Sequence, residues 1–207
     1  MECPPRGTRT ADARTVDART GGARNARRYD APMEERTVSS THPWTGRRIR
    51  VRVDEVERDD GHRTTREIVE HPGAVAILAW DGERLAMVRQ WRHATGRELL
   101  EIPAGTLEPD EAPATTARRE LAEEVGLAAA TWVEGPRFYT APGFCTELMH
   151  LFLATELSHA TADADEDEQL EPSWMRLDEA LAAIDDGRIE DAKSMAAIGW
   201  LDRRLRS

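Results

Sequence analysis

Three glutamates near the middle of this 207-residue chain have the spacing of a metal site. Glu120, Glu123 and Glu124 stand at positions i, i+3 and i+4, so an α-helix brings all three to nearly the same face. Like charges at these spacings destabilise a helix unless something neutralises them. Carboxylate oxygens are the preferred ligands of hard divalent ions, and Mg²⁺ is held by a few carboxylates together with substrate phosphates. The cluster therefore indicates a metal site for a phosphate compound, with a solvated acidic helix face as the alternative.

The flanking residues predict a helix that presents these glutamates beside a loop. Pro113 suits the first turn, where a missing N–H costs nothing, and Gly126 suits the left-handed position after the last turn. Gly105 and the turn-forming residues 107–110 make the preceding segment a loop. A stripe of apolar residues at four-residue spacing predicts the face that packs on a core, with the glutamates facing away: Ala117, Leu121 and Val125.

The whole segment resembles the Nudix box in every defined position. The matching residues are Gly105, Glu111, Arg119-Glu120-Leu121, Glu123-Glu124 and Gly126-Leu127. About nine fixed or restricted positions at fixed spacing rarely coincide by chance, which makes the motif specific. The resemblance implies an α/β Nudix fold, in which a mixed β-sheet is sandwiched between α-helices, and a metal-dependent hydrolase.

Composition excludes several other classes of protein. A net charge of −11 argues against a nucleic-acid-binding surface, because nothing would offset repulsion from the phosphates. The chain lacks an apolar run of the roughly 18 residues that a membrane helix needs, and its N-terminus lacks the apolar stretch of a secretion signal. Its two cysteines, Cys3 and Cys145, offer no disulfide framework. We therefore expect a cytoplasmic protein that binds neither nucleic acid nor membrane.

The chain divides into three parts by residue pattern. Residues 1–32 are rich in Arg, Ala, Thr, Gly and Asp, which predicts a disordered arm. The alternatives are a basic arm for nucleic acid, weakened by interspersed acids, and a translation start at Met33. Residues 33–71 predict a small N-terminal antiparallel β subdomain that serves dimerisation or substrate binding. Residues 72–207 predict the Nudix hydrolase domain.

Periodicity predicts most of the elements that hold the box in place. Asp81-Gly82 between two apolar runs predicts a hairpin of residues 74–80 and 84–90. The acidic residues 161–171 predict a loop. Further strands are expected at residues 48–56, 64–70, 132–140 and 148–155, and helices at residues 177–184 and 191–201.

Stretches outside the box resemble one subgroup, the ADP-ribose and ADP-sugar pyrophosphatases. Residues 98–105 resemble the entry into the box in that subgroup, and residues 88–92 resemble the preceding strand. Pro142 follows Leu127 by 15 residues, as in the ADP-ribose enzymes, and residues 187–194 resemble the start of their C-terminal helix. The resemblance covers the chain from about Trp44 to Leu201.

This resemblance assigns roles to the acidic residues. Glu120 and Glu124 would be the main ligands of Mg²⁺, or of Mn²⁺ in its place, with Glu123 as a helper and the Ala104 carbonyl as a further ligand. Arg119 would hold Glu111 or Glu123. The general base that deprotonates water would be Glu166, with Glu168 as a second base or a metal ligand and a solvated acidic loop as the alternative. Glu147 is a third base candidate, or a contact to metal or to the terminal ribose.

The resemblance also suggests substrate contacts. Arg92 is expected at a phosphate and Arg66 beside it, because the guanidinium fork suits phosphate oxygens. Trp44 and Arg47 are expected at the adenine, with interface packing as the alternative role of Trp44. The expected function is Mg²⁺-dependent hydrolysis of ADP-ribose or a related ADP-sugar to AMP and a sugar phosphate, by a homodimer. The alternatives are another nucleoside diphosphate sugar or a dinucleotide as substrate, and a non-catalytic sensor that binds ADP-ribose.

Overall fold

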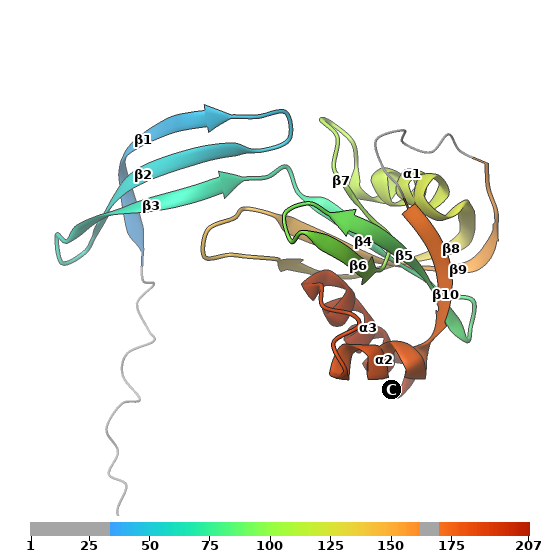
Figure 1. The fold of residues 1–207 in the computed structure, drawn as a ribbon. Helices are drawn as coiled ribbons and strands as arrows, with labels where there is room; N and C mark the ends of the chain where they lie inside the picture. Colours follow the sequence, from blue (N-terminus) through green and yellow to red (C-terminus); the bar gives the residue numbers. More distant parts are fainter. Residues whose placement is uncertain (1–33, 162–169) are drawn as a thin grey trace, which may run out of the picture.

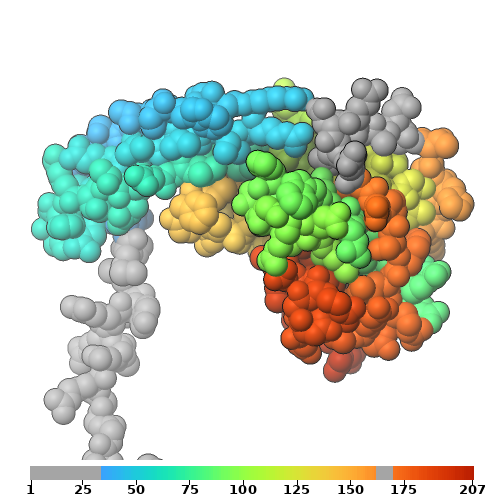
Figure 2. All heavy atoms as spheres, in the orientation of Figure 1, coloured from blue at the N-terminus to red at the C-terminus, as the bar shows by residue number. Residues whose placement is uncertain are grey.

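An antiparallel sheet at the N-terminal end stands apart from the rest of the molecule. The computed structural model describes residues 34–161 and 170–207. Its first three strands are β1 (Glu35–Thr45), β2 (Arg50–Arg58) and β3 (Arg63–Glu70), and they pair in chain order. The sheet projects beyond the main body (Figures 1 and 2). The small antiparallel β unit expected from the alternating residues is confirmed.

In the described part of the chain, two further sheets and three helices make up the main body. In the four-stranded sheet the order is β7 (Ala104–Thr106), β4 (Ala74–Ala79), β9 (Leu148–His159) and β8 (Leu127–Tyr139). In the three-stranded sheet the order is β10 (Leu170–Arg176), β5 (Arg84–Arg92) and β6 (Arg97–Glu101). The helices are α1 (Pro113–Val125), α2 (Leu177–Asp185) and α3 (Ala192–Leu205). Among the described residues, no helix has both the length and the apolar character needed to cross a membrane.

The central strand β4 separates two hydrophobic clusters. All six of its residues are buried, and their side chains alternate between the two faces of the sheet. Ala74, Ala76 and Leu78 pack in the cluster that includes residues of α2 and α3. Val75 and Ile77 pack in the cluster that includes Ala117 and Leu121 of α1. Helices therefore cover the strands on both sides (Figure 1), which confirms the α/β sandwich.

The expected hairpin of β4 and β5 is wrong. A single bridge joins Trp80 to Leu85, after which the strands enter different sheets. β4 pairs with β7 on one edge and, in parallel, with β9 on the other, so both of its edges are occupied. The Asp81-Gly82 turn thus marks a change of direction without specifying the pairing, because the turn is local and the partners are distant. The sequence analysis also missed β1, β6, β7 and β10 as strands.

The helix predicted from the box forms as expected. Pro113 occupies its first turn, and Gly126 follows its last turn with φ of 65°. The Gly126 N–H donates to the Ala122 carbonyl, which closes the last turn. Ala117 and Leu121 are fully buried, so the apolar stripe fixes the rotation of α1 about its axis. This rotation directs the box residues toward β7.

Candidate active site

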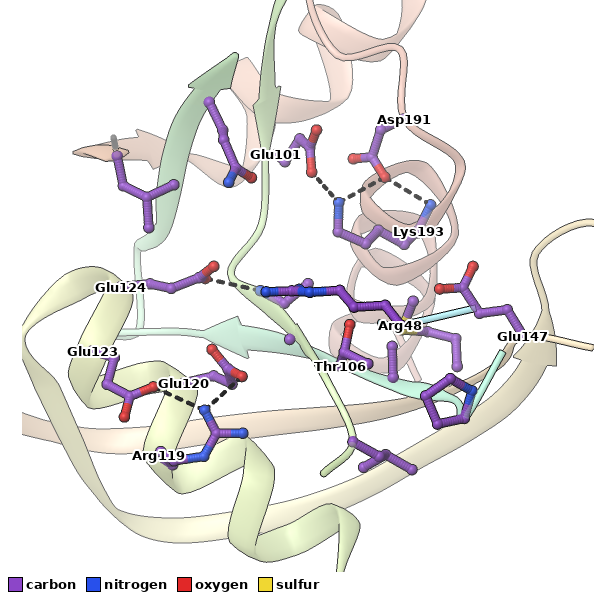
Figure 3. A pocket seen from close by; sticks show the side chains of 18 of the residues that line it. Arg48, Glu101, Thr106, Arg119, Glu120, Glu123, Glu124, Glu147, Asp191 and Lys193 are labelled. Carbon is purple, nitrogen blue, oxygen red and sulfur yellow. Dashed lines mark hydrogen bonds and ion pairs between the residues drawn. The ribbon is translucent and has the colours of Figure 1, made fainter. Parts of the chain in front are cut away.

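A pocket of about 1500 Å³ opens between α1, the β1–β2 hairpin and the start of α3 (Figure 3). Seven of the residues that the sequence analysis assigned to catalysis, metal binding or substrate binding line it: Arg47, Arg92, Ala104, Glu120, Glu123, Glu124 and Glu147. Trp44 and Arg66 do not line it. Glu166 and Glu168 lie outside the described residues. The pocket therefore brings together box residues and substrate candidates that are far apart in the sequence.

Arg119 gathers the carboxylates on one wall of the pocket. Its guanidinium donates to Glu111 at 3.2 and 3.1 Å, and its Nη1 atom donates to Glu120 and to Glu123 at 2.8 Å each. The hydrogen bond from Arg119 lowers the pKa of Glu111, and the hydrogen bond to Glu111 raises the pKa of Arg119. Arg119 is thus a positioning residue for the acidic face of α1, as the sequence analysis expected.

β7 receives this acidic face in close contact. The Ala104 N–H donates to Oε2 of Glu124 at 2.9 Å. A Cβ added to Gly105 would lie 1.9 Å from the Cδ atom of Glu120, so only glycine leaves room for that carboxylate. Glu124 is only 7% exposed, so it does not stand on an open, solvated helix face, whereas its place beside the segment around Gly105 agrees with the expectation. The reason is that β7 lies directly beside α1 and buries the carboxylate against its backbone.

A second charged cluster, which the sequence analysis missed, forms the opposite wall. Glu101, whose side chain is 2% exposed, accepts from Arg92 at 2.9 and 2.7 Å and from Lys193. Lys193 also binds Asp191 at 3.0 Å, and the Asp191 carboxylate caps α3 by accepting from two backbone N–H groups. Burial raises the pKa of Glu101, but Arg92 and Lys193 together bring it below its usual value. We call Arg92, Glu101, Asp191 and Lys193 the buried charge cluster.

One member of this cluster is distinctive in the sequence, although its rarity does not indicate its partner. Lys193 is the only lysine in a chain whose other 27 cationic residues are arginines. The sequence analysis had assigned Arg92 to a phosphate. Arg92 lines the pocket, and its guanidinium also forms a two-pronged ion pair with Glu101.

Other predicted residues have partners of their own. Glu147 reaches the pocket wall, where its carboxylate accepts from the Thr140 hydroxyl and lies 3.6 Å from Nε2 of His71. Arg66 is bound to Glu35 across the exposed N-terminal sheet. The ring of Trp44 covers Gly46, since a Cβ on Gly46 would lie 2.2 Å from the Cη2 atom of Trp44. Within one copy of the chain, Arg66 and Trp44 therefore belong to the N-terminal sheet rather than to the pocket.

The charge of the pocket fits a cation better than it fits a bare phosphate compound. Among the described residues, nine carboxylates and five cationic side chains line it, an excess of four negative charges. Within that same part of the chain, no three Asp, Glu, His or Cys side chains are already arranged as a complete metal site. Arg119 and the Ala104 N–H hold the box carboxylates instead. This donor set suits Mg²⁺, which takes few protein carboxylates and completes its shell with water and substrate phosphate oxygens.

Comparison with known proteins decides the family. Residues 70–198, more than half of the chain, match the NUDIX domain. The chain belongs to the Nudix family. Together with its relatives, the match identifies it as a Nudix pyrophosphohydrolase, and Nudix hydrolases generally use a divalent metal ion.

Several relatives of this Nudix protein align over most of their own length. An ADP-ribose pyrophosphatase of Bacillus subtilis is 42% identical, over 82% of this chain and 93% of the relative. A methanol dehydrogenase activator of Bacillus methanolicus is 42% identical, over 81% of this chain and 92% of the relative. An ADP-ribose pyrophosphatase of Mycobacterium tuberculosis is 40% identical, over 78% of this chain and 80% of the relative. The crystal structure of an ADP compounds hydrolase superimposes with a TM-score of 0.77 at 22% identity, over 85% and 96% of the two chains, which shows the shared fold.

Proposed function

We propose that this protein hydrolyses the diphosphate of ADP-ribose or a related ADP-sugar to AMP and a sugar phosphate, with Mg²⁺ as its metal ion. The main support for this proposal is the pocket wall on which β7 and Arg119 hold all three glutamates of the box: Glu120, Glu123 and Glu124. Two relatives at 40% and 42% identity are named ADP-ribose pyrophosphatases. Their similarity over most of the chain supports the same substrate class.

The reaction adds water across the bridging P–O bond. The water oxygen bonds to one phosphorus, the bridging oxygen leaves with the other phosphate, and a general base takes the proton of the water. Glu120, Glu124 and the Ala104 carbonyl would hold Mg²⁺, with Glu123 assisting. The ion would neutralise phosphate charge and orient and acidify the water. We propose Glu166 as the base, with Glu168 and then Glu147 as the next candidates.

Two cationic residues are the proposed contacts of the substrate within the pocket. Arg92 lines it with a guanidinium already oriented by Glu101, so a phosphate would meet a donor that needs little further ordering. Arg47 also lines it. Trp44 and Arg66 lie on the exposed N-terminal sheet, where a second copy of the chain would bring them to a substrate. We propose that this sheet forms a homodimer, and sedimentation of the full chain as a monomer would rule this out.

A substrate panel tests the proposal. ADP-ribose, other nucleoside diphosphate sugars and dinucleoside polyphosphates are incubated with the protein and Mg²⁺ or Mn²⁺, and the released nucleotides are separated. We expect AMP and ribose 5-phosphate from ADP-ribose, with the highest kcat/KM in the panel. GDP-mannose is the informative competitor, because relatives at 32–34% identity are named GDP-mannose pyrophosphatases. A preference for GDP-mannose would overturn the substrate, and tight binding of ADP-ribose without turnover would indicate a sensor instead.

A further inference from the structure

We infer that Arg48, at the tip of the β1–β2 hairpin, binds the diphosphate of the substrate. The inference rests on the proposed function and adds a residue to it, since the sequence analysis named Arg47 and left Arg48 without a role. Arg48 lines the pocket, and its side chain extends across it from the side of Glu147 toward Glu124 (Figure 3). Its guanidinium thus faces the box carboxylates from the opposite side of the cavity.

Arg48 and its neighbour Arg47 differ from the other three cations of the pocket in their partners. Arg119 binds three carboxylates, and Arg92 and Lys193 belong to the buried charge cluster. Within the described residues, Arg48 forms no ion pair and no side-chain hydrogen bond, although it reaches into a pocket with excess negative charge. Such an arginine keeps both arms of its fork available for phosphate oxygens.

The hairpin that carries Arg48 is held in place from both sides. Arg47 and Arg48 are the two residues between Gly46 and Ile49, which are joined by a backbone hydrogen bond of 2.9 Å. The Trp44 ring covers Gly46 and fills the space on one side of the turn. A tip fixed in this way presents Arg48 at a defined place, which lowers the entropy lost when a ligand binds.

A further set of contacts joins the three strands of the sheet close to this tip, and one of these strands is bonded to the main body. Arg52 and Arg50 reach the Glu70 carboxylate at 2.7 and 3.0 Å, and His42 lies 3.4 Å from it. The next residue back along β3, Val69, exchanges backbone hydrogen bonds with Phe144 and Thr146 of the main body. The position of Arg48 relative to the pocket is therefore set by contacts that do not involve Arg48 itself.

Binding of a non-hydrolysable substrate analogue tests the inference. The dissociation constant of α,β-methylene ADP-ribose is measured by calorimetry with Mg²⁺ for the wild type, Arg48→Ala, Arg48→Lys and Arg58→Ala. Arg58 is the control, because it is an exposed arginine at the other end of β2 that binds only Asp60 among the described residues. We expect Arg48→Ala to weaken binding about 10- to 100-fold, the usual loss for a charged hydrogen-bonded contact. The dissociation constant of Arg48→Lys should lie between those of the wild type and Arg48→Ala, because a lysine offers a point charge in place of the guanidinium fork.

The remaining outcomes separate the inference from the proposed function. Equal dissociation constants for Arg48→Ala and Arg58→Ala would overturn the role of Arg48. A lower melting temperature of Arg48→Ala, not restored in Arg48→Lys, would also overturn it, because an exposed contact residue contributes little to stability. A wild type that neither binds the analogue nor cleaves ADP-ribose contradicts the proposed substrate instead. In that case the KM of the four proteins is compared for the panel substrate that the wild type cleaves. A higher KM for Arg48→Ala than for Arg58→Ala would support the role of Arg48, and equal values would overturn it.

Discussion

The two charged walls of the pocket handle charge in opposite ways. On the α1 wall, one arginine, Arg119, binds Glu111, Glu120 and Glu123, and all three line the pocket. In the buried charge cluster, two carboxylates meet two cations. The buried charge cluster has equal numbers of carboxylates and cations, whereas three carboxylates of the α1 wall share one arginine beside the pocket. We therefore propose that the buried charge cluster supports the structure and that the α1 wall receives a cation with the substrate.

Glu124→Gln should have the largest effect on the reaction. Glutamine keeps the shape of the side chain and an oxygen that accepts from the Ala104 N–H, while the negative charge is lost. We expect kcat to fall by about 1000-fold, or about 4 kcal/mol in the barrier, with the fold retained. AMP release from ADP-ribose measures it. Glu123→Gln is the matched control and should lose less, and unchanged turnover in Glu124→Gln would refute the metal role of this wall.

Lys193→Met should act on stability through the buried charge cluster. Methionine keeps the length of the side chain but leaves Glu101 buried with only Arg92 to balance it. We expect a loss of about 3 kcal/mol in the free energy of unfolding, measured by urea denaturation. Arg97→Met removes an exposed pair with Glu190 and should cost less than about 1 kcal/mol. Similar losses for both variants would mean that burial of the cluster contributes nothing.

Gly105→Ala should disturb the α1 wall through its shape rather than its charge. The added Cβ would lie 1.9 Å from the Cδ atom of Glu120, so the carboxylate or β7 must move. We expect about 2 kcal/mol of destabilisation and a drop in kcat/KM. Gly143→Ala is the control, since a Cβ there meets nothing within 4 Å. Normal activity in Gly105→Ala would show that the position of Glu120 is not critical.

The smallest expected effect is on the pH dependence of stability. The folded-state pKa of Glu101 lies below its ordinary value of 4.5, so its contribution to stability is present above pH 4.5 and is lost as the pH falls through the lower value. The unfolding free energy of the wild type should therefore fall more steeply with acid than that of Glu101→Gln. If the unfolding free energies of the two proteins fell equally with acid, the lowered pKa of Glu101 would be contradicted.

The sequence predicted those features that local residues determine. Helix α1 was correct because Pro113, Gly126 and the apolar stripe act within a few turns of one another. The β4–β5 hairpin was wrong because a turn signal cannot show that β9 takes the edge of β4. The ion pair of Glu101 and Lys193 joins residues 92 positions apart, so no local pattern reveals it. Arg48 was missed for a similar reason, since its role depends on where the hairpin tip lies relative to the pocket.

The buried position of Lys193 has a practical consequence for labelling chemistry. It is the only lysine in the chain and is 9% exposed. An amine-reactive reagent should therefore leave Lys193 unmodified in the folded protein. Acylation of Lys193 would require the start of α3 to open, so the rate of its labelling would report opening of the pocket wall. Mass spectrometry of the peptide that contains Lys193 would measure this rate of labelling.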